Sequence, residues 1–300
     1  MKAMILAAGL GTRLRPLTLE RPKALVPVGN IPVIDRIIEY LKGHGIREII
    51  VNAHHHPGQI IRHLDGGRPF GVSIEVRVEP EILGTGGGIR NTADFWDDAP
   101  FVVINGDVLT DIDLRKVHED HRRSRALATL VLHDRPPYNQ VRVDGNGNIR
   151  DIAGSEGPGR VAFTGIHVIS PALLDHIPAR GFSSIIDCYR ERIRCGMSIR
   201  GYRCEGHHWR DIGTPRSYRL ANRECLGDDP FRIGPGCRVH PSARLADWAV
   251  VGKGAVLEPG AVVARSVLWE DVRVREGVKI TDSVVTAGTT VTGDTAGAVL

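Results

Sequence analysis

Short apolar runs alternate with amphipathic segments along the first 225 residues of the chain. The runs cover residues 3–8, 46–51, 72–78, 101–104, 126–132, 161–169 and 197–202, and each predicts a buried strand. Between them, apolar residues at helical spacing predict helices at 33–41 (capped by Asn30), 59–64, 88–95, from 114 onward, at 183–193 and at 216–225. Alternating strands and helices predict an α/β domain with a mainly parallel sheet and helices on both faces.

The tail, residues 228–300, follows a different pattern with a six-residue period. Large apolar residues recur at Ile233, Val239, Leu245, Val251, Leu257, Val263 and Trp269, and a small residue follows most of them four positions later. This hexapeptide repeat predicts a short left-handed parallel β-helix. The last three hexads would begin with Arg275, Thr281 and Ala287, as atypical terminal repeats. We therefore expect two domains, residues 1–227 and residues 228–300.

Composition and charge narrow the functional class. A formal net charge of +4 over 300 residues does not favour nucleic acid as a partner. No apolar stretch is long enough to span a membrane, and the N-terminus lacks the pattern of a signal peptide, so we expect a cytoplasmic protein. The five cysteines lack C-x-x-C spacing, which favours reduced thiols over disulfides or zinc. The run His54–His56 favours a loop or helix start over a metal site.

The first apolar run leads into a loop that contains Gly9, Gly11, Thr12 and Arg13, and Lys23 follows ten residues after Arg13. The loop lacks the third glycine of the dinucleotide fingerprint, and no Gly-Lys-Ser/Thr follows as in a P-loop. It does combine glycines, which allow close backbone approach, with fixed cations. This combination favours a nucleoside triphosphate as the ligand.

A further candidate is Asp107, which follows the apolar run 101–104. Ligands of open α/β sheets gather beyond the carboxyl ends of the strands, and a carboxylate there suits Mg²⁺. The alternative is an aspartate that only forms a turn. Asp113, farther on, is better suited to cap the helix that starts at Leu114.

The loop L-A-A-G-L-G-T-R-L-R-P-L-T, with P-K after a short spacer, resembles the signature of the sugar-1-phosphate nucleotidylyltransferases, in particular the mannose-1-phosphate guanylyltransferases. Several members of this family carry a hexapeptide tail. The resemblance implies a Rossmann-like α/β fold, Mg²⁺ as cofactor, and an NTP and a sugar 1-phosphate as substrates. It implies a nucleotide site that consists of Leu6, Ala8, Gly9, Gly11, Thr12, Arg13, Gly84, Thr85 and Gly86. It also implies catalysis by Arg13, Lys23, Asp107 and Asp211, metal binding by the two aspartates, and sugar binding by Thr164 and Gly165.

One departure concerns the sugar phosphate. Many relatives carry Glu-Lys-Pro, whereas this chain has Glu156-Gly157-Pro158, and Arg142, Arg150 or Arg160 would have to replace the lysine. The missing lysine and the T-G-G-G-I segment favour a uridylyltransferase that acts on N-acetylmuramate 1-phosphate or another hexose 1-phosphate. The L-G-T-G-G segment and the tail favour GTP with mannose 1-phosphate or a related sugar, which we place slightly ahead.

Three other expectations stay open at this point. A non-catalytic paralogue that binds NDP-sugar as a regulator is a different class, although it should have lost some of the four catalytic residues. An acyltransferase built on the hexapeptide repeats would need a histidine on the coil, and His240 is the only one there. Because such coils have flat faces, we expect a homo-oligomer formed through the β-helix.

Overall fold

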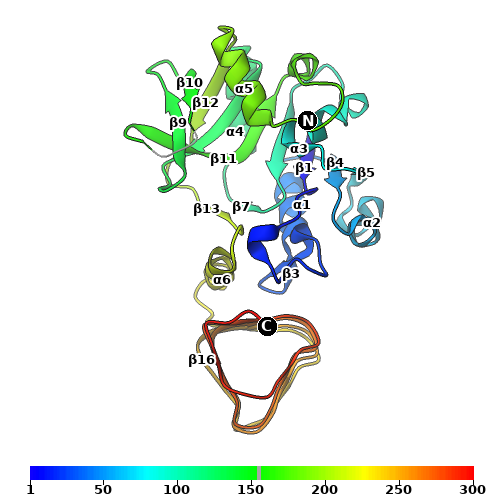
Figure 1. Cartoon of the computed structure of the whole chain (residues 1–300), viewed down its shortest axis with the longest axis vertical. Helices are drawn as coiled ribbons and strands as arrows, with labels where there is room; N and C mark the ends of the chain where they lie inside the picture. Colours follow the sequence, from blue (N-terminus) through cyan, green and yellow to red (C-terminus); the bar gives the residue numbers. More distant parts are fainter. Residues whose placement is uncertain (154–156) are drawn as a thin grey trace. The chain divides into compact units, whose positions relative to one another are not determined.

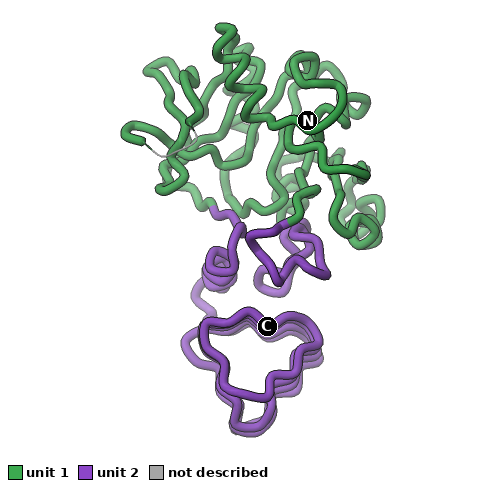
Figure 2. The backbone as a smooth tube through the Cα atoms, viewed as in Figure 1, with its two compact units in different colours: residues 1–10, 36–209 green, residues 11–35, 210–300 purple. Residues whose placement is uncertain are grey.

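The computed structural model describes residues 1–153 and 157–300. The chain forms two compact units, drawn in Figure 2. Unit 1 consists of Met1–Leu10 and Arg36–Trp209, and unit 2 of Gly11–Asp35 and Arg210–Leu300. The glycine loop after Leu10 is therefore compact with the tail rather than with the sheet that precedes it. The predicted domain boundary at 227/228 lies inside unit 2 and stays a prediction.

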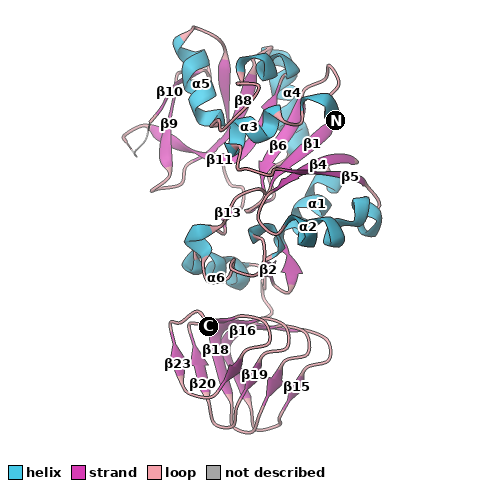
Figure 3. Ribbon diagram, turned by 45° about the vertical axis from the view of Figure 1, so that its right-hand side comes forward, coloured by secondary structure: helices cyan, strands magenta, loops and turns pink. Residues whose placement is uncertain are grey.

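Figures 1 and 3 together label the helices and strands up to residue 224. The α-helices are α1 (Val33–Gly43), α2 (Pro57–Leu64), α3 (Gly84–Arg90), α4 (Leu114–Ser124), α5 (Ile185–Arg194) and α6 (Pro215–Glu224). The strands are β1 (Lys2–Leu6), β2 (Pro27–Val28), β3 (Ile31–Pro32), β4 (Glu48–Ala53), β5 (Ser73–Val78), β6 (Phe101–Asn105), β7 (Val108–Thr110), β8 (Ala128–His133), β9 (Asn139–Val143), β10 (Ile149–Ile152), β11 (Arg160–Ile169), β12 (Ile199–Arg203) and β13 (Trp209–Asp211). Short 3₁₀ helices cover Thr12–Leu14, Lys23–Leu25, Asp65–Phe70, Ala93–Phe95 and Pro171–His176.

Unit 1 is built on one mixed sheet with the strand order β10-β9-β11-β6-β1-β4-β5. Strands β6, β1, β4 and β5 run parallel, and β11 is antiparallel to β6. Strand β8 pairs with β11 and with β12, parallel to the latter. The predicted Rossmann-like α/β fold is confirmed. Its parallel half brings the ends of β1, β4, β5 and β6 to one edge of the sheet.

The central strands are buried on both faces because helices cover the sheet from either side. Met4 and Val103, on neighbouring strands, belong to a core cluster with Ile89 of α3 and Tyr189 of α5. Their neighbours Ile5 and Ile104 are also fully buried. This two-sided burial explains why β1 and β6 read as continuous apolar runs rather than as alternating ones.

One predicted helix start is wrong. Asn30 does not cap α1, because it lies in the turn of a hairpin between β2 and β3. Gly29 and Asn30 have φ values of 57° and 63°, the left-handed pair that two-residue hairpin turns require. Helix α1 begins three residues later, at Val33. By contrast, Asp113 caps α4 as predicted, since its carboxylate accepts from the backbone N–H of Arg115 at 3.0 Å.

The tail forms parallel ladders whose coils stack with a triangular outline in Figure 1, and Figure 3 shows the strands side by side. Its strands are β14 (Phe231–Ile233), β15 (Arg238–Val239), β16 (Arg244–Val251), β17 (Val256–Leu257), β18 (Val262–Leu268), β19 (Arg273–Val274), β20 (Lys279–Thr281), β21 (Val284–Val285), β22 (Thr290–Val291) and β23 (Thr295–Ala296). Strand β16 pairs with β18, and β18 with β20 and β21, all in parallel. The predicted parallel β-helix is confirmed.

The hexad register in the second half of the tail differs from the prediction. The pairing of β16 with β18 shifts by one residue between Ala246 and Ala249, where the first coil has a two-residue corner and the next coil has only Arg265. The core position after Val263 is therefore Leu268, not Trp269. The predicted hexad starts Arg275 and Thr281 are one residue late for this reason, and Ala287 is two residues late because the next coil again has a one-residue corner. The buried core residues at these levels are Val274, Ile280 and Val285, so the apolar core does not fade.

Within residues 1–153 and 157–300, no helix has both the length and the apolar character to cross a bilayer.

Candidate active site

Two buried polar side chains shape the turn after β1. The amide oxygen of Asn52, at the end of β4, accepts from the backbone N–H of Ala7 at 2.8 Å, and its Nδ2 donates to Glu79 Oε1 at 2.7 Å. The other oxygen of Glu79 accepts from the backbone N–H of Leu83 at 3.2 Å. Asn52 and Glu79 are 2% and 1% exposed. They connect the turn beside the predicted nucleotide residues Leu6 and Ala8 with the approach to α3.

The sequence reasoning missed Asn52 and Glu79. The signal that could have found them is a polar residue directly after an apolar strand, which is also the signal that singled out Asp107. Because ligands of such sheets lie beyond the strand ends, polar residues that follow several neighbouring strands are candidates for one shared site.

The loop segment Gly11–Asp35 of unit 2 folds back on itself. Gly11 has a φ of 63°, and a Cβ on it would lie 2.9 Å from Thr18 Cγ2 and 3.3 Å from Lys23 Cβ. The hydroxyl of Thr18 donates to the Gly11 carbonyl at 2.8 Å. Lys23 therefore lies beside Gly11, close in space to the 3₁₀ turn that carries Thr12 and Arg13. Only a glycine fits this position, because both its φ and its space exclude a side chain.

A second glycine of unit 2 places Arg13 and Asp211 together. A Cβ on Gly213 would lie 2.6 Å from Asp211 Oδ2 and 3.4 Å from Arg13 Nη2. The guanidinium of Arg13 and the carboxylate of Asp211, which are far apart in the sequence, thus both lie next to the same backbone position. Four of the predicted site residues, Gly11, Arg13, Lys23 and Asp211, therefore lie within unit 2.

The second glycine-rich segment is itself helical, because α3 begins at Gly84 rather than near Gly88. Added Cβ atoms on Gly84 and Gly86 would lie 2.6 Å from the Ser183 carbonyl oxygen and 2.9 Å from Ser183 Oγ. The Ser183 carbonyl accepts from the N–H of Gly86 at 2.8 Å, and Thr85 Oγ1 accepts from the N–H of Ile185 at 3.0 Å. These glycines let α3 pack against the start of α5. Their predicted contact with the nucleotide stays a prediction.

Asp107 follows β6 in a turn that approaches β1 closely. The N–H of Gly106 donates to the Leu6 carbonyl at 2.9 Å, and a Cβ there would lie 2.8 Å from that oxygen. Beside it, Gly165 has a φ of 79°, and its Cβ position lies 2.5 Å from Asn105 Nδ2. Asn105 therefore lies next to Gly165, the predicted sugar-binding glycine. The sequence analysis did not identify Asn105.

The other predicted sugar-binding residue, Thr164, is buried, and its hydroxyl donates to the Val131 carbonyl at 2.9 Å. Its own carbonyl accepts from the indole N–H of Trp209 at 2.8 Å. The hydroxyl and the carbonyl group of Thr164 thus both form hydrogen bonds within unit 1. Its role in sugar binding stays a prediction.

The donor set for a metal is carboxylate oxygen, which suits Mg²⁺. Among the residues that the structure describes, no group of three or more His, Cys, Asp or Glu side chains could hold a metal ion. Asp107 belongs to unit 1 and Asp211 to unit 2. Their shared Mg²⁺ stays a prediction, in which substrate phosphates would complete the coordination.

The predicted departure at Glu156 lies outside the described residues. Of the arginines considered in place of the missing lysine, Arg150 pairs with Asp144 at 2.6 Å and Arg160 with Asp151 at 2.7 Å. Arg160 also lines a cavity of about 390 Å³ in unit 1, together with Arg203 and Glu205. Arg150 lines a smaller cavity of about 210 Å³, so both arginines have a paired guanidinium and an adjacent cavity.

The chain belongs to the nucleotidyl transferase family, whose model matches residues 2–227. It is 33% identical to a UTP–glucose-1-phosphate uridylyltransferase of Synechocystis sp., over 80% of this chain and 68% of that protein. It is 30% identical to a mannose-1-phosphate guanylyltransferase of Mycobacterium tuberculosis, over 93% of this chain and 82% of that protein. The resemblance drawn from the opening motif is confirmed, and the chain is an enzyme of the nucleotidyltransferase class.

Solved structures agree with this assignment. A putative glucose-1-phosphate thymidylyltransferase from Bacillus anthracis, in complex with a sucrose, is 28% identical to the chain with a TM-score of 0.68. The match covers 76% of this chain and 96% of that one. HddC from Yersinia pseudotuberculosis, complexed with GMP-PN, has a TM-score of 0.64 at 24% identity, which shows the shared fold.

Proposed function

We propose that the protein transfers a nucleotidyl group from an NTP to a sugar 1-phosphate, which yields an NDP-sugar and pyrophosphate. A phosphate oxygen of the sugar attacks the α-phosphorus in line, and the bond to the pyrophosphate leaving group breaks. The attacking oxygen is already ionised near neutral pH, so the reaction needs no general base. Catalysis then consists of positioning the two substrates and neutralising charge.

The observation that carries this proposal is the grouping of Arg13 and Asp211 around Gly213 in unit 2, with Lys23 beside Gly11. Arg13 is the proposed contact to the triphosphate, and Lys23 the proposed contact to the α-phosphate during transfer. Backbone groups from Leu6 to Thr12 would approach the phosphates, since glycines there leave room. Gly84, Thr85 and Gly86 are the proposed neighbours of the nucleobase and ribose, and Gly165 that of the sugar.

Asp107 and Asp211 are the proposed ligands of Mg²⁺. Their carboxylates match the oxygen ligands that this ion prefers. When bound, Mg²⁺ would neutralise charge on the phosphates as the transfer proceeds. The role of the two side chains is to hold the ion at the triphosphate and to leave Arg13 and Lys23 for direct phosphate contacts.

For the substrates we favour GTP with mannose 1-phosphate or a related sugar, and this preference is supported by the guanylyltransferase relatives. A uridylyltransferase that acts on N-acetylmuramate 1-phosphate or another hexose 1-phosphate is the second candidate. It is supported by the missing lysine before Pro158 and by the uridylyltransferase relative.

A panel of pyrophosphate-release assays tests the proposal. It crosses GTP, UTP, dTTP and ATP with mannose, glucose and N-acetylmuramate 1-phosphates, with and without Mg²⁺. We expect release with one NTP and one sugar, and highest turnover with GTP and mannose 1-phosphate. Asp107→Ala should abolish most of the release, whereas Asp113→Ser, which removes a nearby carboxylate but keeps a helix cap, should not. Unchanged release in Asp107→Ala would contradict the mechanism.

The alternative class is a regulatory paralogue that binds NDP-sugar without turnover. The same panel distinguishes it, because this protein would release no pyrophosphate with any pair. It would still bind GDP-mannose or a UDP-sugar in a calorimetric titration. The four catalytic residues that remain in the sequence support the enzyme over the regulator.

A further inference from the structure

Trp269 is a buried residue of the tail that does not belong to the core inside the coils. The register shift after the first coil gives the core position to Leu268, so the neighbouring indole points out of the apolar core. Trp269 is nonetheless only 3% exposed. Other parts of unit 2 must cover it, and the contacts below identify them.

The indole of Trp269 contacts the loop segment Gly11–Asp35 directly. The Arg21 guanidinium lies over the indole ring, with 4.6 Å from Cζ to the ring centroid. The next residue of the tail, Glu270, forms an ion pair with the same guanidinium. The Arg21 side chain is therefore fixed both by an aromatic face and by a carboxylate, the two partners that suit a planar guanidinium.

The indole is also connected, through Tyr218 of α6, to the part of the loop segment that follows Lys23 in the sequence. The Trp269 N–H donates to the Tyr218 hydroxyl at 2.8 Å, and that hydroxyl donates to the Pro27 carbonyl at 2.6 Å. Tyr218 is fully buried. Trp269 is thus linked to the chain two residues before Lys23 and four residues after it.

The hairpin that follows is held in the same way. The amide oxygen of Asn222 accepts from the N–H of Gly29 at 2.8 Å, and Asn30 Nδ2 donates to the Val251 carbonyl of β16 at 2.8 Å. These contacts fix the β2–β3 turn to α6 and to the coil. The positive φ of Asn30 therefore serves a contact to the tail rather than a helix cap.

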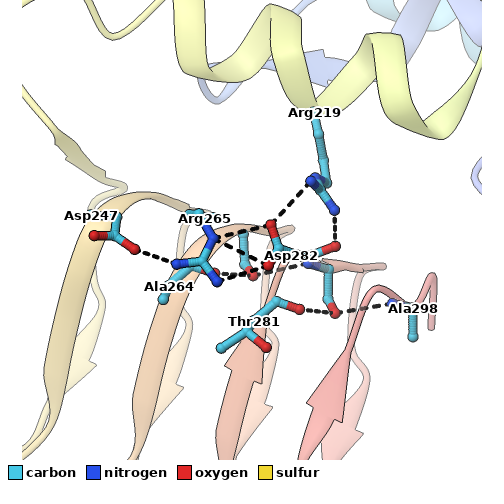
Figure 4. Close-up of polar contacts among 9 residues, drawn as sticks. Arg219, Asp247, Ala264, Arg265, Thr281, Asp282 and Ala298 are labelled. Carbon is cyan, nitrogen blue, oxygen red and sulfur yellow. Dashed lines mark hydrogen bonds and ion pairs between the residues drawn. The ribbon is translucent and has the colours of Figure 1, made fainter.

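A separate contact fixes α6, which begins four residues after Asp211, to the coils. Figure 4 shows Arg219 of α6 reaching the backbone carbonyl and the carboxylate of Asp282. Arg265 pairs with the same carboxylate at 2.8 Å and with Asp247 of the preceding coil. The ion pairs of Arg265 with Asp247 and Asp282 thus hold in place the carboxylate that Arg219 contacts.

We propose that Trp269, with Glu270, positions the loop segment that carries Arg13 and Lys23, so that the β-helix is a working part of the catalytic unit. This proposal rests on the proposed function for the roles of those two cations. Arg21, Trp269 and Glu270 are positioning residues, because they act through the backbone of the loop. In a reaction that depends on placement of phosphates, loosening the loop lowers the rate even though no catalytic side chain is lost.

The test uses the full chain and matched variants. Arg21→Met and Trp269→Leu remove the stacked pair, and Arg273→Met is the control, because it removes an Arg–Glu pair (with Glu258, 2.6 Å) elsewhere on the same β-helix. We expect kcat to fall about tenfold to a hundredfold in the first two and to stay near wild type in the control. Arg21→Lys, which keeps the charge but not the planar group that meets both Trp269 and Glu270, should lose less of the rate than Arg21→Met.

A second measurement does not depend on activity. Trypsin can cleave after Arg13 and Lys23, but not after Arg21, which precedes a proline, so the Met variant removes no cleavage site in the loop. We expect faster cleavage after Arg13 and Lys23 in Arg21→Met and Trp269→Leu, and a wild-type rate in Arg273→Met. Equal cleavage rates in all three variants would overturn the proposal. If the wild type releases no pyrophosphate with any substrate pair, the proposed function fails, and the cleavage rates still decide this inference.

Discussion

At the scale of single residues, several glycines mark where the chain has no room for a side chain. Gly213 is one such case in unit 2, because its backbone φ is ordinary and only its neighbours crowd a Cβ. Those neighbours are Asp211 Oδ2 and Arg13 Nη2, two of the proposed catalytic groups. A methyl group at this position therefore collides with the Asp211 carboxylate and lies in ordinary contact with the Arg13 guanidinium.

We expect Gly213→Ala to lower kcat for pyrophosphate release about tenfold or more, because the new methyl group must displace the Asp211 carboxylate. The matched control is Gly293→Ala, whose Cβ would meet no atom within 4 Å in the same unit. Steady-state kinetics and thermal unfolding of both variants measure the effect. A Gly213→Ala enzyme with the kcat of the control would show that the Asp211 carboxylate can move without consequence.

The sequence predicted this site unevenly. Arg13, Lys23 and Asp211 lie in local motifs, and unit 2 brings them together around two glycines. The sequence analysis did not identify Asn52 and Glu79, because no local motif marks a buried hydrogen-bonded pair. Asn52 lies on β4 and Glu79 follows β5, and only the order of strands in the sheet makes them neighbours. Pairings of that kind depend on tertiary contacts, which local spacing does not encode.

At the scale of elements, helix α3 shows how glycine content can serve packing. A Cβ on Gly88 would lie 2.7 Å from Asn52 Nδ2 and 2.9 Å from Glu79 Oε1, in the middle of the buried polar pair. The predicted helix began only at Gly88, because the glycines before it are poor helix formers. The close approach of α3 to β4 and to the start of α5 is the tertiary reason that overrides this preference.

We expect Gly88→Ala to destabilise the protein by about 1–3 kcal/mol, since the buried polar pair has no space to yield. Gly58→Ala in α2 is the control, because its Cβ would meet only Arg62 Nη1 at an ordinary 3.6 Å. That change should be neutral or stabilise by about 0.5 kcal/mol through helix propensity. Urea unfolding of both variants gives the two free energies. Equal stabilities would argue against the tight packing of α3.

Helix α4 contributes a buried histidine that makes the fold sensitive to acid. The ring of His121 hydrogen-bonds Thr129 Oγ1 of β8 and Ser170 Oγ, each at 2.9 Å. Burial lowers the pKa of His121 from 6.5 to about 4, with a further contribution from His118, while Asp120 opposes the shift. Burial likewise lowers the pKa of His167 to about 3. Both rings are therefore neutral in the folded protein at neutral pH.

The sign of the pH effect follows from these shifts. Below pH 6.5 the unfolded chain binds protons at these histidines that the folded chain does not, so stability falls as the pH drops from about 6.5 toward 4. We expect the melting temperature to decline over this range, and the decline to be shallower in His121→Gln. His240→Gln, at an exposed site on the tail, is the control. A slope in His121→Gln as steep as in the control would contradict the assignment.

The tail shows a limit of pattern reading at the scale of an element. A strict six-residue period predicted the β-helix correctly but placed its later core one residue out, at Arg275 and Thr281 instead of Val274 and Ile280. Each later corner is one residue shorter than the first, and each shifts every position after it by one residue. The same shift places Trp269 outside the core, where its indole contacts Arg21 and Tyr218.

At the scale of the whole molecule, the division into units does not follow the two sequence patterns. The loop segment Gly11–Asp35 belongs with the tail, although it lies between β1 and α1 in the chain. The sequence could predict both the sheet and the coils, since each has its own periodicity. It could not predict that the loop segment is compact with the coils, because this depends on individual contacts such as Arg21 with Trp269.

The first coil of the tail is the place where we predict self-association. Ile233 and Val239 occupy positions that are buried in the later coils, yet they are 49% and 39% exposed. Their strands, β14 and β15, pair on one side only among the described strands, which leaves edge hydrogen-bonding groups for a second copy. Arg232, Arg238 and Arg244 lie on the same coil, and their like charges oppose the approach of two such ends.

We therefore expect a homo-oligomer that becomes more stable as salt is raised, since salt screens the arginine repulsion and strengthens apolar association. Ile233→Asp should shift the protein toward monomer, because it buries a charge at the centre of the contact. Leu220→Asp, another exposed apolar residue but on α6, is the control and should leave the mass unchanged. Light scattering coupled to size-exclusion chromatography at low and high salt measures all three. An oligomer that weakens as salt is raised, or that persists in Ile233→Asp, would place the contact elsewhere on the protein.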